Sequence, residues 1–330
     1  MWDVDSGMLV RSFAGHVGAI TTGAWSPDGR LLYTAGLDRQ ILAWDMAGDA
    51  SFVRTLPLDT AAAVGSAWAT PDSLVVGLSD GHMLFVHRPD GHVIRPPEPA
   101  GTDWLDTVRS GGRGTLVAAA DTDGTVTVWD GSAGRYLGRV DLPTAHLEPQ
   151  VWVADDGVTA ATMRTADGPL FLIDMRTRGV RTVTLHLDLP KNWVPYGVFR
   201  WTHQGQVVIT AGTGVHAIAA ALIVDVHTGR VLHRVPVPGD PGEIVPNPAG
   251  TWLAAAGQDG LLRFISIADG HLLGPAQEAV AGLVYNVSVS PDGRYVATGG
   301  APGQVRLWDT STFREIGPVL PAEPYAPACH

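Results

Sequence analysis

Several residue types are scarce in this chain of 330 residues, and each scarcity argues against a class of protein. The single cysteine, Cys329, cannot form a disulfide within the chain, which favours a reducing compartment, so we expect a cytoplasmic protein. No apolar run approaches the roughly 18 residues that a membrane span needs, and no basic stretch followed by an apolar core marks a secretory signal. We therefore expect neither membrane insertion nor secretion.

Lysine is almost absent, with Lys191 the only one, and the formal net charge is −11. A nucleic-acid-binding domain usually carries a basic stripe, because contacts with phosphates supply most of its non-specific affinity. This sequence has no such stripe, so we expect no nucleic-acid partner. Abundant Ala, Gly, Arg and Pro beside so little Lys is typical of a bacterial proteome of high GC content, which indicates a bacterial origin.

What the chain does contain is a repeated order of turn and strand signals. The first full copy runs from Gly15-His16 through the turn Ser26-Pro27-Asp28-Gly29 to Trp44-Asp45. The positions that close a copy are Trp2-Asp3, Trp44-Asp45, His87-Arg88, Trp129-Asp130, Ile173-Asp174, Val224-Asp225, Ile265-Ser266 and Trp308-Asp309. They are 41 to 44 residues apart, except for the fifth interval of 51 residues. Seven intervals indicate seven units.

A tight turn in each unit is a second marker with the same register. Its clearest copies are Ser26-Pro27-Asp28-Gly29 and Ser290-Pro291-Asp292-Gly293. In such a turn Pro sets φ at the second position, Asp bonds to nearby backbone, and Gly takes the corner with positive φ. Short apolar runs between turns, such as Leu116–Ala120, predict buried strands.

These features resemble the WD-repeat β-propeller family, whose repeat of roughly 40–45 residues ends in Trp-Asp. The resemblance covers the whole chain. It implies an all-β fold, a seven-bladed β-propeller of four-stranded antiparallel blades. We expect residues 1–320 to form this single propeller and the Pro-rich residues 321–330 to be a loosely ordered tail.

The first residues match the end of a third strand, so the chain starts in mid-repeat. By resemblance to bacterial WD-repeat arrays, we expect the C-terminal propeller of a longer signalling protein. Two segments, Met8–Phe13 and Phe313–Leu320, have the pattern of the fourth strand of the last blade. Propellers of this family usually close with the N-terminal strand, which predicts that Met8–Phe13 takes this place and that the segment from Phe313 onward is displaced or lies alongside.

His16, Thr34, Asp38 and Trp44 match the structural tetrad of the family. The resemblance implies that their side chains form a chain of hydrogen bonds within the first blade, and such a satisfied network rigidifies a fold. A hydroxyl, an imidazole and a carboxylate are also the parts of a hydrolase site, but the hydroxyl would lie inside the blade. We therefore predict a structural tetrad and no catalytic residues. Other blades retain only parts of it, such as Asp123 and Trp129 in the third.

The histidines do not have the spacing of metal ligands. His82, His87 and His92 are spread over a strand, its end and the next turn, and the chain has no Cys-x-x-Cys pair or His-x-x-x-His helix. We expect no metal and no cofactor.

A partner is expected where the family binds its ligands, on the top side of the ring. This side is formed by the loops that connect the fourth strand to the next blade and the second strand to the third. Aromatic residues beside charges are typical of a binding patch. The candidates are Trp104, Asp106, His146, Glu148, Lys191, Trp193, Tyr196, His216, Asp240, Glu243, Tyr285 and Asn286. Tyr196 and Tyr285 could instead begin first strands and belong to the core.

The fifth unit is the longest, and we expect its extra residues largely in Thr213–Ile218, with a second long loop at Asp188–Trp193. Long loops often carry function. We therefore predict that the partner docks across blades three to five, anchored by Trp193.

The resemblance implies a non-catalytic protein–protein interaction scaffold that is monomeric and presents its top face to a peptide or protein. Two alternatives remain open. One is an enzyme or small-molecule sensor that uses the central channel, although the inner strands offer mostly Ala, Val, Thr and Gly. The other is an intramolecular clamp on an N-terminal catalytic domain. Fold alone does not decide between them.

Overall fold

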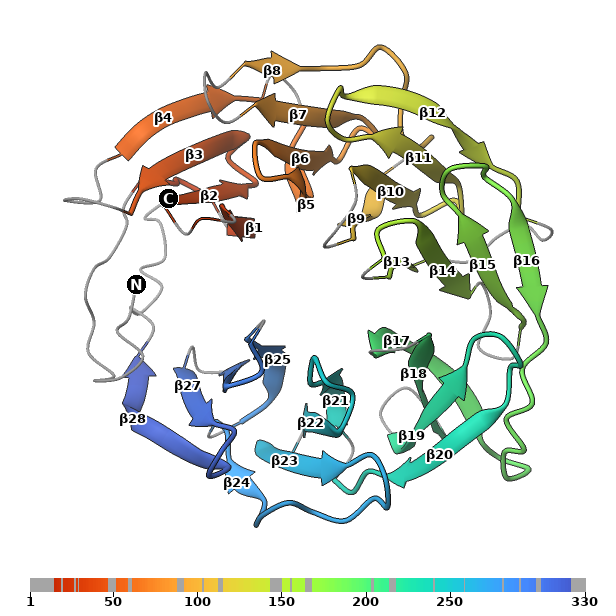
Figure 1. Ribbon diagram of the computed structural model, residues 1–330. Helices are drawn as coiled ribbons and strands as arrows, with labels where there is room; N and C mark the ends of the chain where they lie inside the picture. The colour runs from red at the N-terminus through yellow and green to blue at the C-terminus, as the bar shows by residue number, and fades with distance from the viewer. Residues whose placement is uncertain are drawn as a thin grey trace. The chain divides into compact units, whose positions relative to one another are not determined.

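The computed structural model describes most of the chain between residues 15 and 321. The described residues are 15–18, 20–26, 28, 30–46, 52–58, 61–87, 92–102, 104–111, 115–142, 150–154, 156–163, 168–202, 205–213, 218–239, 241–257, 259–280, 282–290, 292–300 and 304–321. These residues form strands and turns (Figure 1). None of them belongs to a helix long and apolar enough to cross a membrane.

The described strands form seven four-stranded sheets, in which all neighbours are antiparallel. The first two sheets are β1 (Ile20–Trp25), β2 (Leu31–Gly36), β3 (Gln40–Asp45), β4 (Phe52–Pro57) and β5 (Ala63–Thr70), β6 (Ser73–Leu78), β7 (Met83–His87), β8 (Val93–Ile94). The third and fourth are β9 (Leu105–Ser110), β10 (Leu116–Asp121), β11 (Val126–Asp130), β12 (Arg135–Val140) and β13 (Gln150–Val153), β14 (Thr159–Met163), β15 (Leu170–Asp174), β16 (Val180–Val183).

The remaining three sheets follow the same plan. They are β17 (Val194–Thr202), β18 (Gln206–Gly212), β19 (Ile218–Asp225), β20 (Val231–Pro236); β21 (Pro241–Pro246), β22 (Trp252–Gly257), β23 (Leu261–Ser266), β24 (Gln277–Glu278); and β25 (Val284–Val289), β26 (Tyr295–Gly300), β27 (Gln304–Asp309), β28 (Arg314–Pro321). The predicted fold class, seven four-stranded antiparallel blades of a β-propeller, is confirmed.

The chain divides into two compact units, and each is described by itself. The unit Ala14–Thr184 contains the first four sheets, and the unit that includes Leu185–His330 contains the last three. Within each unit the first strand of one sheet contacts the first strand of the next, as β5 contacts β9 and β21 contacts β25. In each sheet the fourth strand forms the edge opposite to the first strand (Figure 1).

The repeat markers agree with the strands in register. Third strands end at the predicted closing positions, as β3 does at Asp45 and β27 at Asp309. Gly157, Gly205 and Gly293 in the tight turns have φ of 66°, 73° and 72°, which is the positive-φ corner that the turn pattern predicts. Local turn chemistry therefore sets the strand boundaries.

The core lies between neighbouring sheets. All six residues of β22, Trp252–Gly257, are buried, whereas the fourth strand β20 is mostly exposed. Small side chains such as Ala254 and Ala256 let the next sheet approach closely, and the cluster is completed by Trp308 from that sheet. The second strand β22 is therefore apolar throughout, whereas the fourth strand β20 exposes His233 and Arg234.

Hydroxyl groups join successive first strands in the unit Ala14–Thr184. Thr21 donates a hydrogen bond to the carbonyl of Ala63 (2.6 Å), and the hydroxyls of Thr22 and Ser66 are 2.7 Å apart. Ser110 donates to the carbonyl of Trp68 (2.5 Å). Each of these bonds connects one sheet to the next.

The expectation about closure of the last blade is wrong. Its fourth strand is β28, Arg314–Pro321, which pairs with β27 from Asp309↔Arg314 to Gln304↔Pro321. The C-terminal segment therefore holds the place that was assigned to Met8–Phe13, which lies outside the described residues. Pro321, which was assigned to the tail, belongs to β28, and the rest of the tail, 322–330, lies outside the described residues.

The fifth unit has a long connection where one was predicted, because β16 ends at Val183 and β17 begins only at Val194. Ile218 is already the first residue of β19, and 214–217 lie outside the described residues. Part of the added length is in the nine-residue strand β17, whose pairing with β18 shifts between Tyr196 and Phe199. The bulge therefore adds length inside a strand, where the sequence pattern predicted no irregularity.

Candidate functional site

The four side chains of the tetrad lie within hydrogen-bond distance of one another in the first sheet. Trp44 Nε1 donates to Thr34 Oγ1 (2.9 Å), which is 2.8 Å from His16 Nε2, and His16 Nδ1 is 2.8 Å from Asp38 Oδ2. The side chains of His16 and Asp38 are 5% and 1% exposed. With Nδ1 donating to the carboxylate, neutral His16 accepts the hydroxyl proton of Thr34 at Nε2. The hydroxyl is therefore occupied on both sides.

Other sheets use the equivalent positions differently. In the last sheet Trp308 Nε1 still donates to Thr298 Oγ1 (3.1 Å). In the third, Trp129 Nε1 donates to Thr127 Oγ1 (3.0 Å). In the sixth, the carboxylate of Asp259 has an arginine partner, Arg263, with which it forms an ion pair of 2.5 Å. The turn carboxylate is thus retained while its partner changes.

The third sheet contains a buried carboxylate that the tetrad pattern missed. Asp121 is fully buried and accepts hydrogen bonds from the N–H groups of Thr102 and Thr125 (both 2.7 Å). Asp123, the residue that the pattern selected, is exposed and accepts from the Thr102 hydroxyl (2.8 Å). The only sequence signal was an aspartate at the end of an apolar strand.

The predicted partner-binding residues have different surroundings. Trp104 is 45% exposed, and Lys191 and Asn286 are also exposed, whereas Trp193 and Glu243 are half-buried. Asp106, Tyr196 and Tyr285 lie in β9, β17 and β25, and their side chains are outside the described part of the structure, as are His146, Glu148, His216 and Asp240 as whole residues. Glu243 and Asn286 lie in first strands, β21 and β25, and not in loops.

The loop that carries Trp104 is held from both sides. The N–H groups of Ala100 and Gly101 donate to the carbonyl of Gly81 (2.8 and 3.0 Å). Thr102 is bound to Asp121, and the N–H of Thr122 donates to the carbonyl of Trp104 (3.1 Å). These hydrogen bonds therefore hold the backbone at Trp104, while 45% of the surface of the residue remains exposed.

We call the segments joined by these bonds, residues 79–82, 95–102, 104–106 and 121–125, the Trp104 rim. The sequence of the rim contains one arginine and five carboxylates, so its formal charge is −4 with His82 neutral; the carboxylates are Asp80, Glu98, Asp106, Asp121 and Asp123. Arg95 forms an ion pair with Asp80 (2.9 Å). The rim lies at the ends of the strands in the second and third sheets, where β6 connects to β7 and β10 connects to β11.

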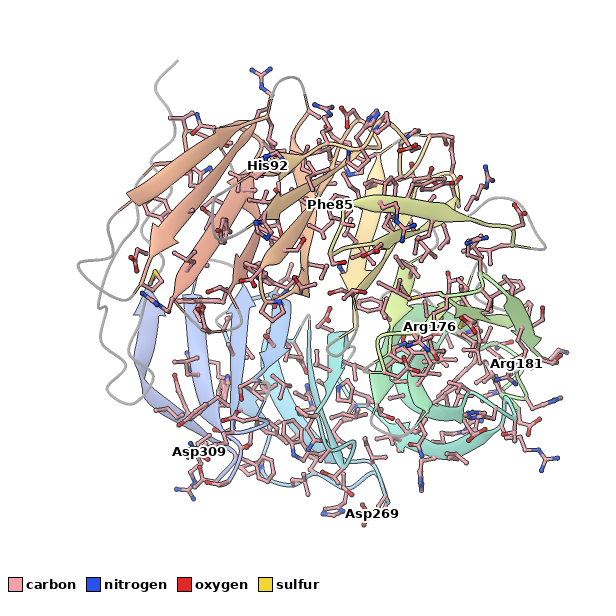
Figure 2. The ribbon with its side chains drawn as sticks, turned by 45° about the horizontal axis from the view of Figure 1, so that its top comes forward. Phe85, His92, Arg176, Arg181, Asp269 and Asp309 are labelled. Carbon is pink, nitrogen blue, oxygen red and sulfur yellow. The ribbon has the colours of Figure 1, made fainter. Side chains whose placement is uncertain are left out.

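Turn aspartates in the last two sheets have lowered pKa values. A hydrogen bond from Ser266, followed by one from His271, lowers the pKa of Asp269 to about 2. The hydroxyl of Ser311 donates to Asp309 Oδ1 (2.6 Å) and holds the pKa of that carboxyl below its usual value. Figure 2 shows Asp269 and Asp309 near the turns that leave β23 and β27. These carboxylates stabilise turns by accepting hydrogen bonds.

No group of three or more His, Cys, Asp or Glu side chains among the described residues could hold a metal ion. The described geometry offers rigid loops, an exposed indole and carboxylates, which are the components of a binding surface.

The repeated sheets and the tetrad define a seven-bladed β-propeller. The family model for the WD domain, G-beta repeat, matches residues 7–45 and 275–309. An uncharacterised WD repeat-containing protein of Schizosaccharomyces pombe is 24% identical over 77% of this chain and 40% of its own length. The matched repeats and the seven sheets confirm the resemblance to the WD-repeat β-propeller family.

Two further relatives match parts of the chain. The pre-mRNA-splicing factor cwf17 of Schizosaccharomyces pombe is 31% identical over 49% of this chain and 47% of its own length. The protein groucho of Drosophila melanogaster is 31% identical over 28% of this chain and 13% of its own length. The chain spans less than half the length of each of these relatives.

Proposed function

We propose that this chain is a non-catalytic scaffold that binds a peptide or protein partner. The partner binds at the ends of the blades where the second strand connects to the third. The observation that carries the proposal is Trp104, an indole that is 45% exposed on a loop whose backbone is fixed by hydrogen bonds. Rigid aromatic side chains are the usual anchors of protein interfaces, because little conformational freedom is lost on binding. The family supports this role, since WD-repeat proteins generally bind other proteins.

This proposal moves the anchor from Trp193 to Trp104. Trp193 is half-buried and therefore less accessible than Trp104, and its backbone N–H donates to the carbonyl of Pro190 (2.8 Å). Whether Trp193 also contacts a partner stays a prediction.

The test compares Trp104→Ala with Leu232→Ala, which removes a side chain of equal exposure, 45%, from the fourth strand β20. The 330-residue chain and both variants are used to capture partners from an extract of the source organism. We expect a partner held by the wild type and by Leu232→Ala to be lost by Trp104→Ala, while all three proteins melt at the same temperature. Capture that is unaffected by Trp104→Ala would contradict the proposal.

A further inference from the structure

We infer that the Trp104 rim binds a basic peptide segment, in which an arginine or lysine side chain stacks on the indole of Trp104 and pairs with Asp123. The inference rests on the proposed function and adds the chemical class of the partner. It starts from the exposed indole, because Trp is the best aromatic ring for binding a cation over its face.

The charge of the rim selects the sign of the partner. The rim carries a formal charge of −4, a large share of the −11 that the whole chain of 330 residues carries. A local concentration of one sign attracts segments of the opposite sign and speeds their association. Acidic peptides and nucleic acids would be repelled by the same field.

Asp123 is placed to pair with such a cation. Its side chain is exposed, and its Oδ2 atom accepts a hydrogen bond from Thr102 Oγ1 (2.8 Å), which fixes the carboxylate. Within the described part of the chain, Oδ1 has no hydrogen-bond partner. The residue next to Asp123, Thr122, donates its N–H to the carbonyl of Trp104, so the carboxylate and the indole belong to connected segments.

The protein already contains an interaction of this type. In the same unit, the guanidinium carbon of Arg109 on β9 lies 4.6 Å from the ring centre of Trp152 on β13. That pair joins two neighbouring blades. At the rim, Trp104 offers the same kind of ring from an exposed position, where the cation would come from the partner.

Three labelled pools of short degenerate peptides test the inference. They are identical except that two central positions are Arg in the first pool, Gln in the second and Glu in the third. Affinity for the 330-residue chain is measured by fluorescence polarisation at low and at physiological salt. We expect the Arg pool to bind best, with an affinity that falls as salt rises.

The variants separate this inference from the proposed function. Trp104→Ala should weaken binding of the Arg pool roughly thirtyfold, as loss of an interface anchor does. Asp123→Asn should weaken it about threefold at low salt and less at high salt. Asp123→Lys should weaken binding of the Arg pool more than Asp123→Asn does, because it replaces the pairing carboxylate with a charge of the same sign as the peptide. The control is Asp72→Asn, which removes the same charge from the turn between β5 and β6, at the other end of these strands. It should leave the affinity for the Arg pool unchanged.

Two results would overturn the inference in different ways. If the Gln or Glu pool binds the wild type as tightly as the Arg pool, and Trp104→Ala still abolishes binding, the partner class is wrong while the proposed function stands. If the Arg pool binds Trp104→Ala and Asp123→Lys as it binds the wild type, the rim is not the binding surface, and both proposals fail.

Discussion

Gly101 lies so close to Asp121 that a Cβ atom on the glycine would be 2.6 Å from the Cβ and 2.7 Å from the Oδ2 of the aspartate. This approach lets Asp121 reach the N–H of Thr102 and thereby fixes the loop that carries Trp104. Glycine is required here by space, because real Cβ atoms do not approach other atoms so closely.

Gly101→Ala should therefore destabilise the protein by about 1–3 kcal/mol, because the loop or the buried carboxylate must move. Denaturant unfolding measures the loss. Gly65→Ala is the matched control in the same unit, since its Cβ would meet no atom closer than 3.9 Å. If both variants unfold at the same denaturant concentration, the packing of Gly101 on Asp121 is not important for stability.

The tetrad of the first blade should contribute to stability. Asp38→Ala leaves His16 and the N–H of Val17 without their shared acceptor, which should cost about 1–3 kcal/mol of unfolding free energy. Asp141→Ala, at an exposed position, should stay within about 0.5 kcal/mol of the wild type. An unchanged melting temperature for Asp38→Ala would show that the hydrogen bonds contribute nothing.

Phe313 joins the last two blades in an unusual backbone conformation. Its φ is 53°, and its ring lies 4.9 Å from that of Phe264 and 6.2 Å from that of Trp252. Phe313→Ala loses both ring contacts and keeps a left-handed backbone, whereas Phe313→Gly loses the contacts but removes the backbone cost. We expect the glycine variant to be more stable than the alanine variant by about 1 kcal/mol, measured by denaturant unfolding. The opposite order would mean that the φ angle is not costly.

The pH dependence of one turn can be predicted from its hydrogen bonds. Because the Ser311 hydroxyl lowers the folded-state pKa of Asp309, the carboxylate stabilises the folded state at pH values above its ordinary pKa. That contribution disappears as pH falls through the lowered folded pKa. Ser311→Ala should therefore raise the pKa of Asp309 and reduce stability at neutral pH. It should have no effect at a pH below the lowered folded-state pKa, where the carboxyl group of Asp309 is protonated in both proteins. Carboxyl NMR titration and unfolding at several pH values check both points.

The blade boundaries could be predicted because they depend on local chemistry. Turn residues such as Gly157 and Gly293 and closing positions such as Asp45 act within a few residues of chain, so their pattern is visible in the sequence. The same pattern could not distinguish Asp121 from Asp123 as the buried carboxylate. That distinction depends on Thr102, which is distant in sequence and is brought near only by packing.

The closing strand could not be predicted for a related reason. Met8–Phe13 and Phe313–Leu320 have similar strand patterns, and the family habit favoured the first. Pairing of β28 with β27 is helped by the short turn after Asp309 and by the contacts of Phe313 with Trp252 and Phe264. A two-residue bulge in β17 was likewise hidden, because periodicity locates a strand but not an irregularity inside it.

The hydrogen bonds that hydroxyl groups form between neighbouring first strands affect how the unit Ala14–Thr184 unfolds. Thr21 and Ser110 each donate to a carbonyl of another blade, so opening one blade leaves a polar group of its neighbour without a partner in a crowded interior. Local openings are then coupled, and partial unfolding of one blade carries the cost of its neighbour. The backbone amides of the inner strands in these blades should accordingly exchange with solvent deuterium at a common rate, as one cooperative block.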